Sequence, residues 1–143
     1  NIQGDSVITM EHLPGGGFTD EKLPKALIIR TLPNESDKTS KDWANTNPTY
    51  LHSDFTDRLV ERGVEHLLVD LPSVDKEIDG GALLSHRAFF RVPEAPRTEA
   101  TITEFVFIPN EVEDGLYALN LQLAPFDLDA SPSRPVIYPL SVI

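Results

Sequence analysis

The chain contains no cysteine, and this absence excludes several kinds of chemistry at once. Without thiols there is no disulfide, no thiolate nucleophile and no cysteine-ligated zinc site. Any metal ion must then be held by histidine, aspartate, glutamate, carbonyl oxygens or water. The Gly-x-Ser-x-Gly and His-Glu-x-x-His motifs are also missing, so neither a serine hydrolase of that type nor a zinc peptidase is indicated.

Basic residues are scarce. Lys and Arg number 12 against 23 Asp and Glu, which gives a net charge of −11. This balance argues against binding to nucleic acid or to anionic membrane surfaces, because both need a basic footprint. No apolar run approaches the roughly 18 residues of a membrane span. No signal peptide is visible, and we expect a cytoplasmic location.

The remaining composition is that of a globular α/β protein. Hydrophobic residues make up 40% of the 143 positions, enough for a core, and we expect residues 1–143 to form a single domain. A helix is predicted to begin at Ser53, as its N-cap, and to stop at Gly63. Three consecutive glycines, Gly15 to Gly17, predict a surface loop. Strands are predicted at 26–31, 64–69, 101–108, 116–123 and 136–142. Because strand, helix and strand follow in order, the strands at 26–31 and 64–69 should be parallel.

An acidic loop follows the predicted strand at 64–69. Its carboxylates are Asp70, Asp75, Glu77 and Asp79. Gly80 and Gly81 then allow a turn, and the next apolar segment carries His86. Functional sites are often built in this way at the carboxyl end of a strand. A solvated turn is the more common explanation of such a loop.

Glu104 is the strongest purely physical indication of a site. Alternation along 101–108 places it between Ile102 and Val106 on an aliphatic strand face. A carboxylate on such a face must be paired, protonated or metal-bound if the face is buried. At an edge position Glu104 would instead be in contact with water.

Several segments of the chain resemble one family in the same order. They are ALIIRTLPN at 26–34, LLVDLPSVD followed by GGALLSHRAFF, and ITEFVFIPN at 102–110 with the sequence that continues to Tyr138. Together they resemble the cyclase/kynurenine formamidase family of metal-dependent amidohydrolases. The most specific motif of that family, HxGTHxDxPxH, does not occur here. We therefore expect the chain to correspond to the C-terminal part of a family member.

The resemblance implies a swivelling β/β/α fold, incomplete without its N-terminal portion, and a divalent metal, Zn²⁺ or Mn²⁺. It assigns His86 and Glu104 as metal ligands and gives His86 a catalytic role, with the general base in the missing motif. The implied reaction is hydrolysis of an aryl formamide or a cyclic amide by metal-activated water, with formylkynurenine, isatin-like and polyketide substrates known in the family. A tryptophan-catabolic role is one such possibility.

The resemblance also suggests that a loop containing Trp43 and Tyr50 lines a substrate pocket, although an aromatic anchor for a long loop is an equal interpretation. The expected partners are a small-molecule substrate, the missing N-terminal portion and further copies of the chain in a homodimer or higher homo-oligomer. The alternative function is a non-catalytic domain of the same fold that acts in assembly or binding.

Overall fold

The computed structural model describes residues 4–12 and 23–140, which belong to two compact units divided between Ile108 and Pro109. The predicted glycine loop at Gly15 to Gly17 lies outside the described residues. The first unit contains both α-helices, and the second contains a β-hairpin. That residues 1–143 form one domain stays a prediction.

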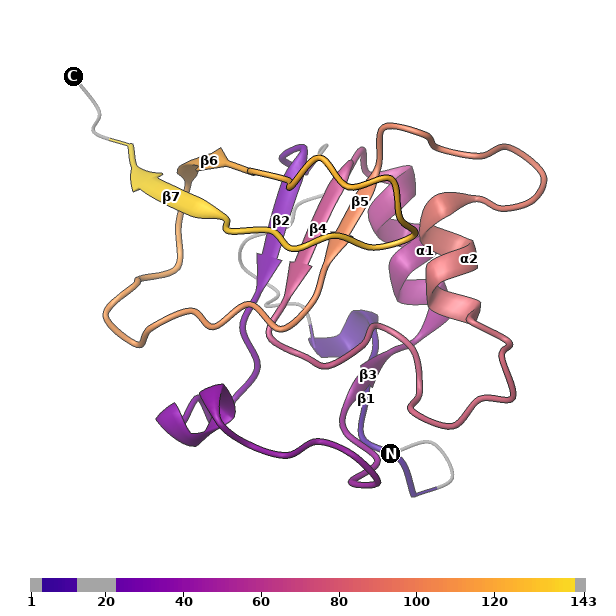
Figure 1. The fold of residues 1–143 in the computed structure, drawn as a ribbon, viewed down its shortest axis with the longest axis horizontal. Helices are drawn as coiled ribbons and strands as arrows, with labels where there is room; N and C mark the ends of the chain where they lie inside the picture. Colours follow the sequence, from indigo (N-terminus) through magenta and orange to yellow (C-terminus); the bar gives the residue numbers. More distant parts are fainter. Residues whose placement is uncertain (1–3, 13–22, 141–143) are drawn as a thin grey trace. The chain divides into compact units, whose positions relative to one another are not determined.

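A three-stranded parallel sheet lies at the centre of the first unit. It consists of β2 (Ala26–Ile29), β4 (His66–Val69) and β5 (Thr101–Thr103), in the order β2-β4-β5 (Figure 1). The register pairs His66 with Ala26 on one side and with Thr101 on the other. The predicted parallel pairing of the first two strands is therefore confirmed. The middle strand is aliphatic because both of its faces are buried.

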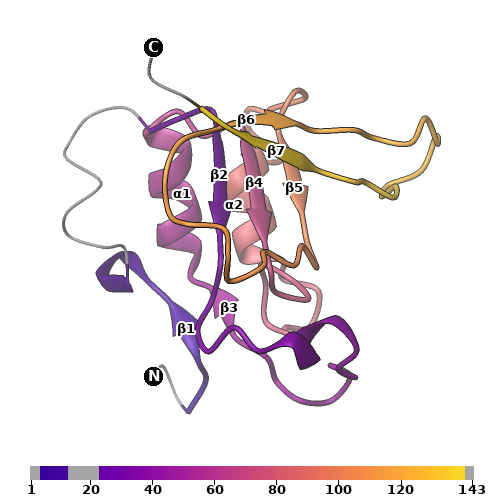
Figure 2. The same ribbon diagram turned by 90° about the vertical axis from the view of Figure 1, so that its left-hand side faces the viewer.

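Two helices, α1 (Ser53–Glu61) and α2 (Leu84–Phe90), cover one face of this sheet (Figures 1 and 2). Their apolar sides meet the sheet in one core, whose buried members include Leu51, Phe55, Leu59, Val64, Leu67, Val69, Leu71, Val74 and Phe89. The helix start at Ser53 is confirmed, but the predicted N-cap is wrong. His52 is the cap, because its Nδ1 accepts the backbone N–H of Asp54 at 3.2 Å. Gly63 follows the helix with a φ of 90°, as its predicted stop role requires.

The smaller elements complete the two units. In the first, β1 (Val7–Ile8) pairs in parallel with β3 (Tyr50–Leu51), and short 3-10 helices occupy Met10–His12 and Ser36–Thr39. In the second, β6 (Tyr117–Asn120) pairs antiparallel with β7 (Val136–Pro139). The predicted mixed α/β class is thus confirmed, while the swivelling arrangement and the incompleteness of the fold stay predictions.

The strand predicted after the acidic loop needs correction. The strand predicted at 101–108 ends at Thr103, because Phe105 has a φ of 58°, a left-handed conformation that interrupts a strand. The segment Leu84–Phe90, which carries His86, is helical. Across residues 4–12 and 23–140, no helix combines the length and apolarity needed to cross a membrane.

Candidate functional site

The candidate site lies where β4 and β5 end. The chain leaves β4 at Val69, passes through an acidic loop and enters α2 at Leu84, while Glu104 comes directly after β5. Because these strands are parallel, their carboxyl ends lie at the same edge of the sheet. Open α/β sheets commonly place their functional groups at this edge.

His86 is held by the buried carboxylate of Asp75. The Nδ1 atom of His86 lies 2.6 Å from Oδ2 of Asp75, and the same oxygen accepts the backbone N–H of His86 at 3.2 Å. The other oxygen, Oδ1, accepts the backbone N–H of Ser85 at 2.6 Å. Asp75 is 5% exposed, so these N–H groups take the place of its hydration. One carboxylate therefore fixes both the start of α2 and the imidazole on it.

Glu104 faces the other nitrogen of the same imidazole. Its Oε1 lies 3.7 Å from Nε2 of His86, which is too long for a hydrogen bond. The backbone N–H of Val74 donates to this Oε1 at 2.9 Å and so orients the carboxylate. Both side chains are partly exposed, 29% for His86 and 28% for Glu104. The structure thus brings together the two residues that the sequence singled out, with their functional atoms facing each other.

The electrostatics of the cluster follow from these contacts. The hydrogen bond that His86 donates to Asp75 raises the pKa of His86 above its ordinary 6.5. Burial opposes this shift, and the negative charge of Glu104 adds to it. Burial raises the pKa of Asp75, but its hydrogen bonds with His86 and with the backbone of Ser85 outweigh burial. The pKa of Asp75 is therefore lowered from 3.8. Asp75 is ionised at neutral pH and presents a negative charge to the ring.

The donor set fits a divalent metal ion in part. Imidazole nitrogen and carboxylate oxygen both ligate Zn²⁺ and Mn²⁺, and a ligating histidine commonly donates its other N–H to a carboxylate, as His86 does. A metal site usually needs about three protein ligands. Within the described parts of the chain, no group of three or more His, Cys, Asp and Glu side chains is placed to hold an ion. His86 and Glu104 therefore supply two donors, fewer than a metal site usually has.

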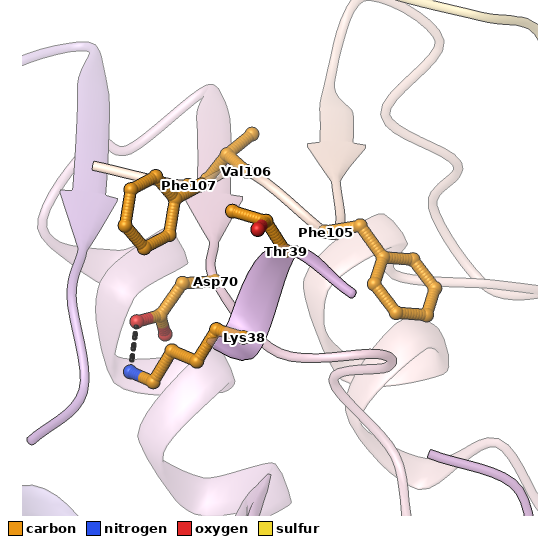
Figure 3. Close-up of a pocket in the computed structure, with 6 residues that line it drawn as sticks. All are labelled: Lys38, Thr39, Asp70, Phe105, Val106 and Phe107. Carbon is orange, nitrogen blue, oxygen red and sulfur yellow. Dashed lines mark hydrogen bonds and ion pairs between the residues drawn. The ribbon is translucent and has the colours of Figure 1, made fainter. Parts of the chain in front are cut away.

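A second buried carboxylate, Asp70, lies beside a small pocket at the same sheet edge. Lys38 Nζ donates to Asp70 Oδ2 at 2.9 Å, and the two side chains point toward each other in Figure 3. The pocket has a volume of about 210 Å³. Its lining is Lys38, Thr39, Asp70, Phe105, Val106 and Phe107. The pocket is thus lined by apolar side chains from Phe105 to Phe107 and by the ion pair of Lys38 and Asp70.

Trp43 and Tyr50 each contact a charged side chain in the structure. Lys41 Nζ lies 4.2 Å from the centre of the Trp43 ring, a cation–π contact. The Tyr50 hydroxyl donates to Asp5 Oδ2 at 3.2 Å. Burial is the larger cause of the raised pKa of Tyr50, and this hydrogen bond is the second. Neither aromatic lines the pocket in Figure 3. A substrate-binding role for them stays a prediction.

Asp75 is the residue that sequence reasoning left without a role. Its only signal was its position in an acidic loop after a buried strand, and most such loops are solvated. The structure distinguishes Asp75 from Glu77 and Asp79 by its burial, and from Asp70 by its contact with a histidine 11 positions away.

Comparison with known proteins gives a partial relationship. No protein-family model matches the chain. The kynurenine formamidase of Bacillus cereus (strain ATCC 10987 / NRS 248) is 38% identical over 92 residues, which is 64% of this chain and 40% of that enzyme. The match therefore spans less than half of the relative's length. Over this stretch it supports a relationship to the kynurenine formamidases and suggests a hydrolase that acts on a non-peptide C–N bond.

Proposed function

We propose that the chain contributes part of the active site of a metal-dependent hydrolase that cleaves the C–N bond of an aryl formamide or a cyclic amide. The observation that carries the proposal is the pair of donor atoms, His86 Nε2 and Glu104 Oε1, which face each other at 3.7 Å at the carboxyl edge of a parallel sheet. The similarity to a kynurenine formamidase supports the reaction class. It does not favour the alternative of a non-catalytic assembly domain.

In this proposal His86 and Glu104 ligate a divalent ion, Zn²⁺ or Mn²⁺, together with ligands from outside the described residues. Such an ion, when bound, supplies Lewis-acid activation of water and of the amide carbonyl. The role of His86 is to present the Nε2 lone pair while Nδ1 stays hydrogen-bonded to Asp75. The role of Glu104 is to present an anionic oxygen whose direction is set by the Val74 N–H.

The nearby pocket offers a place for the apolar part of a small-molecule substrate. Phe105 follows Glu104 directly and is 63% exposed. Phe107, at 37% exposure, adds a second ring to the same lining. Aromatic rings pack favourably against aromatic ligands. We therefore propose that the ring of an aryl substrate packs against Phe105 and Phe107.

The test measures metal content and hydrolysis in the full-length protein that carries this chain. Formanilide is the substrate, and Zn²⁺ or Mn²⁺ is added to the metal-free protein. We expect His86→Ala and Glu104→Gln each to lose bound metal and hydrolysis together, because each removes a ligand. His66→Ala is the matched control, since His66 lies in β4 with its Nδ1 against Thr101 Oγ1 and should keep both. Full metal and full rate in either variant would falsify the role of that residue.

A further inference from the structure

We propose that Asp75 is a positioning residue that keeps the proton of the neutral His86 ring on Nδ1, so that the Nε2 lone pair faces Glu104. The consequence for metal binding rests on the proposed function, whereas the consequence for the imidazole does not.

The contacts of Asp75 leave its carboxylate one way to bind the ring. An ionised carboxylate only accepts hydrogen bonds, so the His86 Nδ1 atom at 2.6 Å must carry the proton. In the neutral imidazole the other nitrogen then carries the lone pair. The same Oδ2 also accepts the His86 backbone N–H at 3.2 Å. Main chain and ring of one residue are thus tied to one oxygen, which restricts rotation of the ring.

The loop that carries Asp75 also orients Glu104. Val74 is fully buried, and its N–H donates to Glu104 Oε1 at 2.9 Å. Its carbonyl oxygen accepts the N–H of Leu51 at 3.0 Å, which anchors the loop to β3. The hydroxyl of Ser85 donates to the carbonyl of Leu51 at 2.8 Å, so α2 is anchored to the same strand residue. Two adjacent residues, Val74 and Asp75, therefore set the direction of both candidate ligands before any ion binds.

A capping role alone does not account for Asp75. Asp79, in the same loop, also accepts two backbone N–H groups before α2, from Gly81 at 2.7 Å and from Leu83 at 2.6 Å. Within residues 4–12 and 23–140 its hydrogen bonds are confined to this turn, and it acts on His86 through its charge alone, whereas Asp75 bonds the ring. Asp79→Asn is therefore a matched control that perturbs the same turn and leaves the imidazole contact in place.

The experiment uses the full-length, metal-free protein labelled with ¹⁵N in its histidine rings. NMR at a pH where the imidazole is neutral reports which nitrogen of His86 carries the proton. We expect the Nδ1–H tautomer to predominate in the wild type and in Asp79→Asn. In Asp75→Asn the single amide oxygen cannot serve both Ser85 and His86, and the Nδ1–H population should fall. Titration with Zn²⁺ alone should show an affinity about 10–100-fold weaker for Asp75→Asn and unchanged for Asp79→Asn.

The outcomes separate this inference from the proposed function. A wild-type His86 that carries its proton on Nε2 overturns the inference, as does an Asp75→Asn variant with wild-type tautomer and affinity. Because the wild-type spectrum decides the first point, a variant that does not fold leaves the inference testable. If the Nδ1–H tautomer is found and lost as expected, but the wild type neither binds Zn²⁺ nor hydrolyses formanilide, the proposed function fails and the positioning role stands.

Discussion

Asp70 and Asp75 lie in the same loop after β4 and are equally buried, each 5% exposed, yet their partners differ. Asp70 Oδ2 accepts hydrogen bonds from the Thr31 backbone N–H at 2.8 Å, from its hydroxyl at 3.2 Å and from Lys38 Nζ at 2.9 Å. Asp75 accepts from the backbone of Ser85 and His86 and from the imidazole of His86. Burial and charge alone do not distinguish the two sites.

The two carboxylates differ in whether the side chain that they bind has another polar atom for a further contact. The side chain of Lys38 is 12% exposed. Its ammonium also contacts the carbonyl and hydroxyl oxygens of Thr31 and Oδ1 of Asn34, so its donors are used within the fold. His86 uses one ring nitrogen on Asp75 and directs the other toward Glu104. A lysine has no second functional atom, whereas a histidine does. The first pair is therefore structural, and the second can serve a site.

The largest expected effect comes from breaking the structural pair. Lys38→Met keeps the length of the side chain and leaves Asp70 buried without its cation; Asp70 Oδ1 already has no hydrogen-bond partner among the described residues. We expect a loss of about 3–5 kcal/mol in the free energy of unfolding, measured by urea denaturation. Lys25→Met is the control, because Lys25 pairs with Glu65 at the surface and is 70% exposed. Its loss should stay below about 1 kcal/mol, and equal losses would contradict the comparison.

An intermediate effect on stability is expected at the other pair. His86→Ala removes one hydrogen bond to an ionised carboxylate, but Asp75 keeps the backbone N–H of Ser85 and of residue 86. The free energy of unfolding of the metal-free protein should fall by about 2 kcal/mol, less than for Lys38→Met. A loss as large as that of Lys38→Met would mean that His86 is a structural residue like Lys38. The same denaturation series measures both variants.

The smallest effect concerns a third, more open pair. Lys76 Nζ lies 2.7 Å from Asp5 Oδ2, and hydrogen bonds from Lys76 and Asn47 lower the pKa of Asp5 from its ordinary 3.8. The pKa of Lys76 is raised from 10.5, chiefly by the hydrogen bond to Asp5. A lowered carboxyl pKa contributes stability that is fully present above pH 3.8 and is lost as the pH falls through the pKa of the folded state. A raised lysine pKa contributes stability that is fully present below pH 10.5 and is lost as the pH rises through the pKa of the folded state.

Asp5→Asn should therefore differ from the wild type by a constant amount between about pH 4 and pH 10 and converge with it in acid. Urea denaturation over a pH series measures the difference. Lys76→Met should reproduce the loss, and the double variant should add little to either single change. A difference that does not shrink in acid would show that the contact contributes by packing.

Local patterns predicted much of this fold. The aliphatic stretches at Ala26–Ile29 and His66–Val69 are strands, the helix begins at Ser53, and the two strands pair in parallel. Such features depend on residues close in sequence, whose side chains repeat with the period of a strand or a helix. The strand beyond Thr103 was overestimated, because alternation continues in the sequence through Phe105 while the backbone there is left-handed.

For the candidate site, too, some features could be predicted from the sequence and others depend on the fold. The amino-acid sequence by itself determined the chemical inventory: no thiols, an excess of carboxylates, and a resemblance that singled out His86 and Glu104. Only the tertiary structure decided which partner each carboxylate meets, since Lys38 and Asp70 are 32 positions apart and Val74 and Glu104 are 30 apart. Such contacts form where separate elements pack, and no local periodicity encodes them. For this reason the sequence could indicate the ligands, while Asp75, which orients one of them, became visible only in the folded chain.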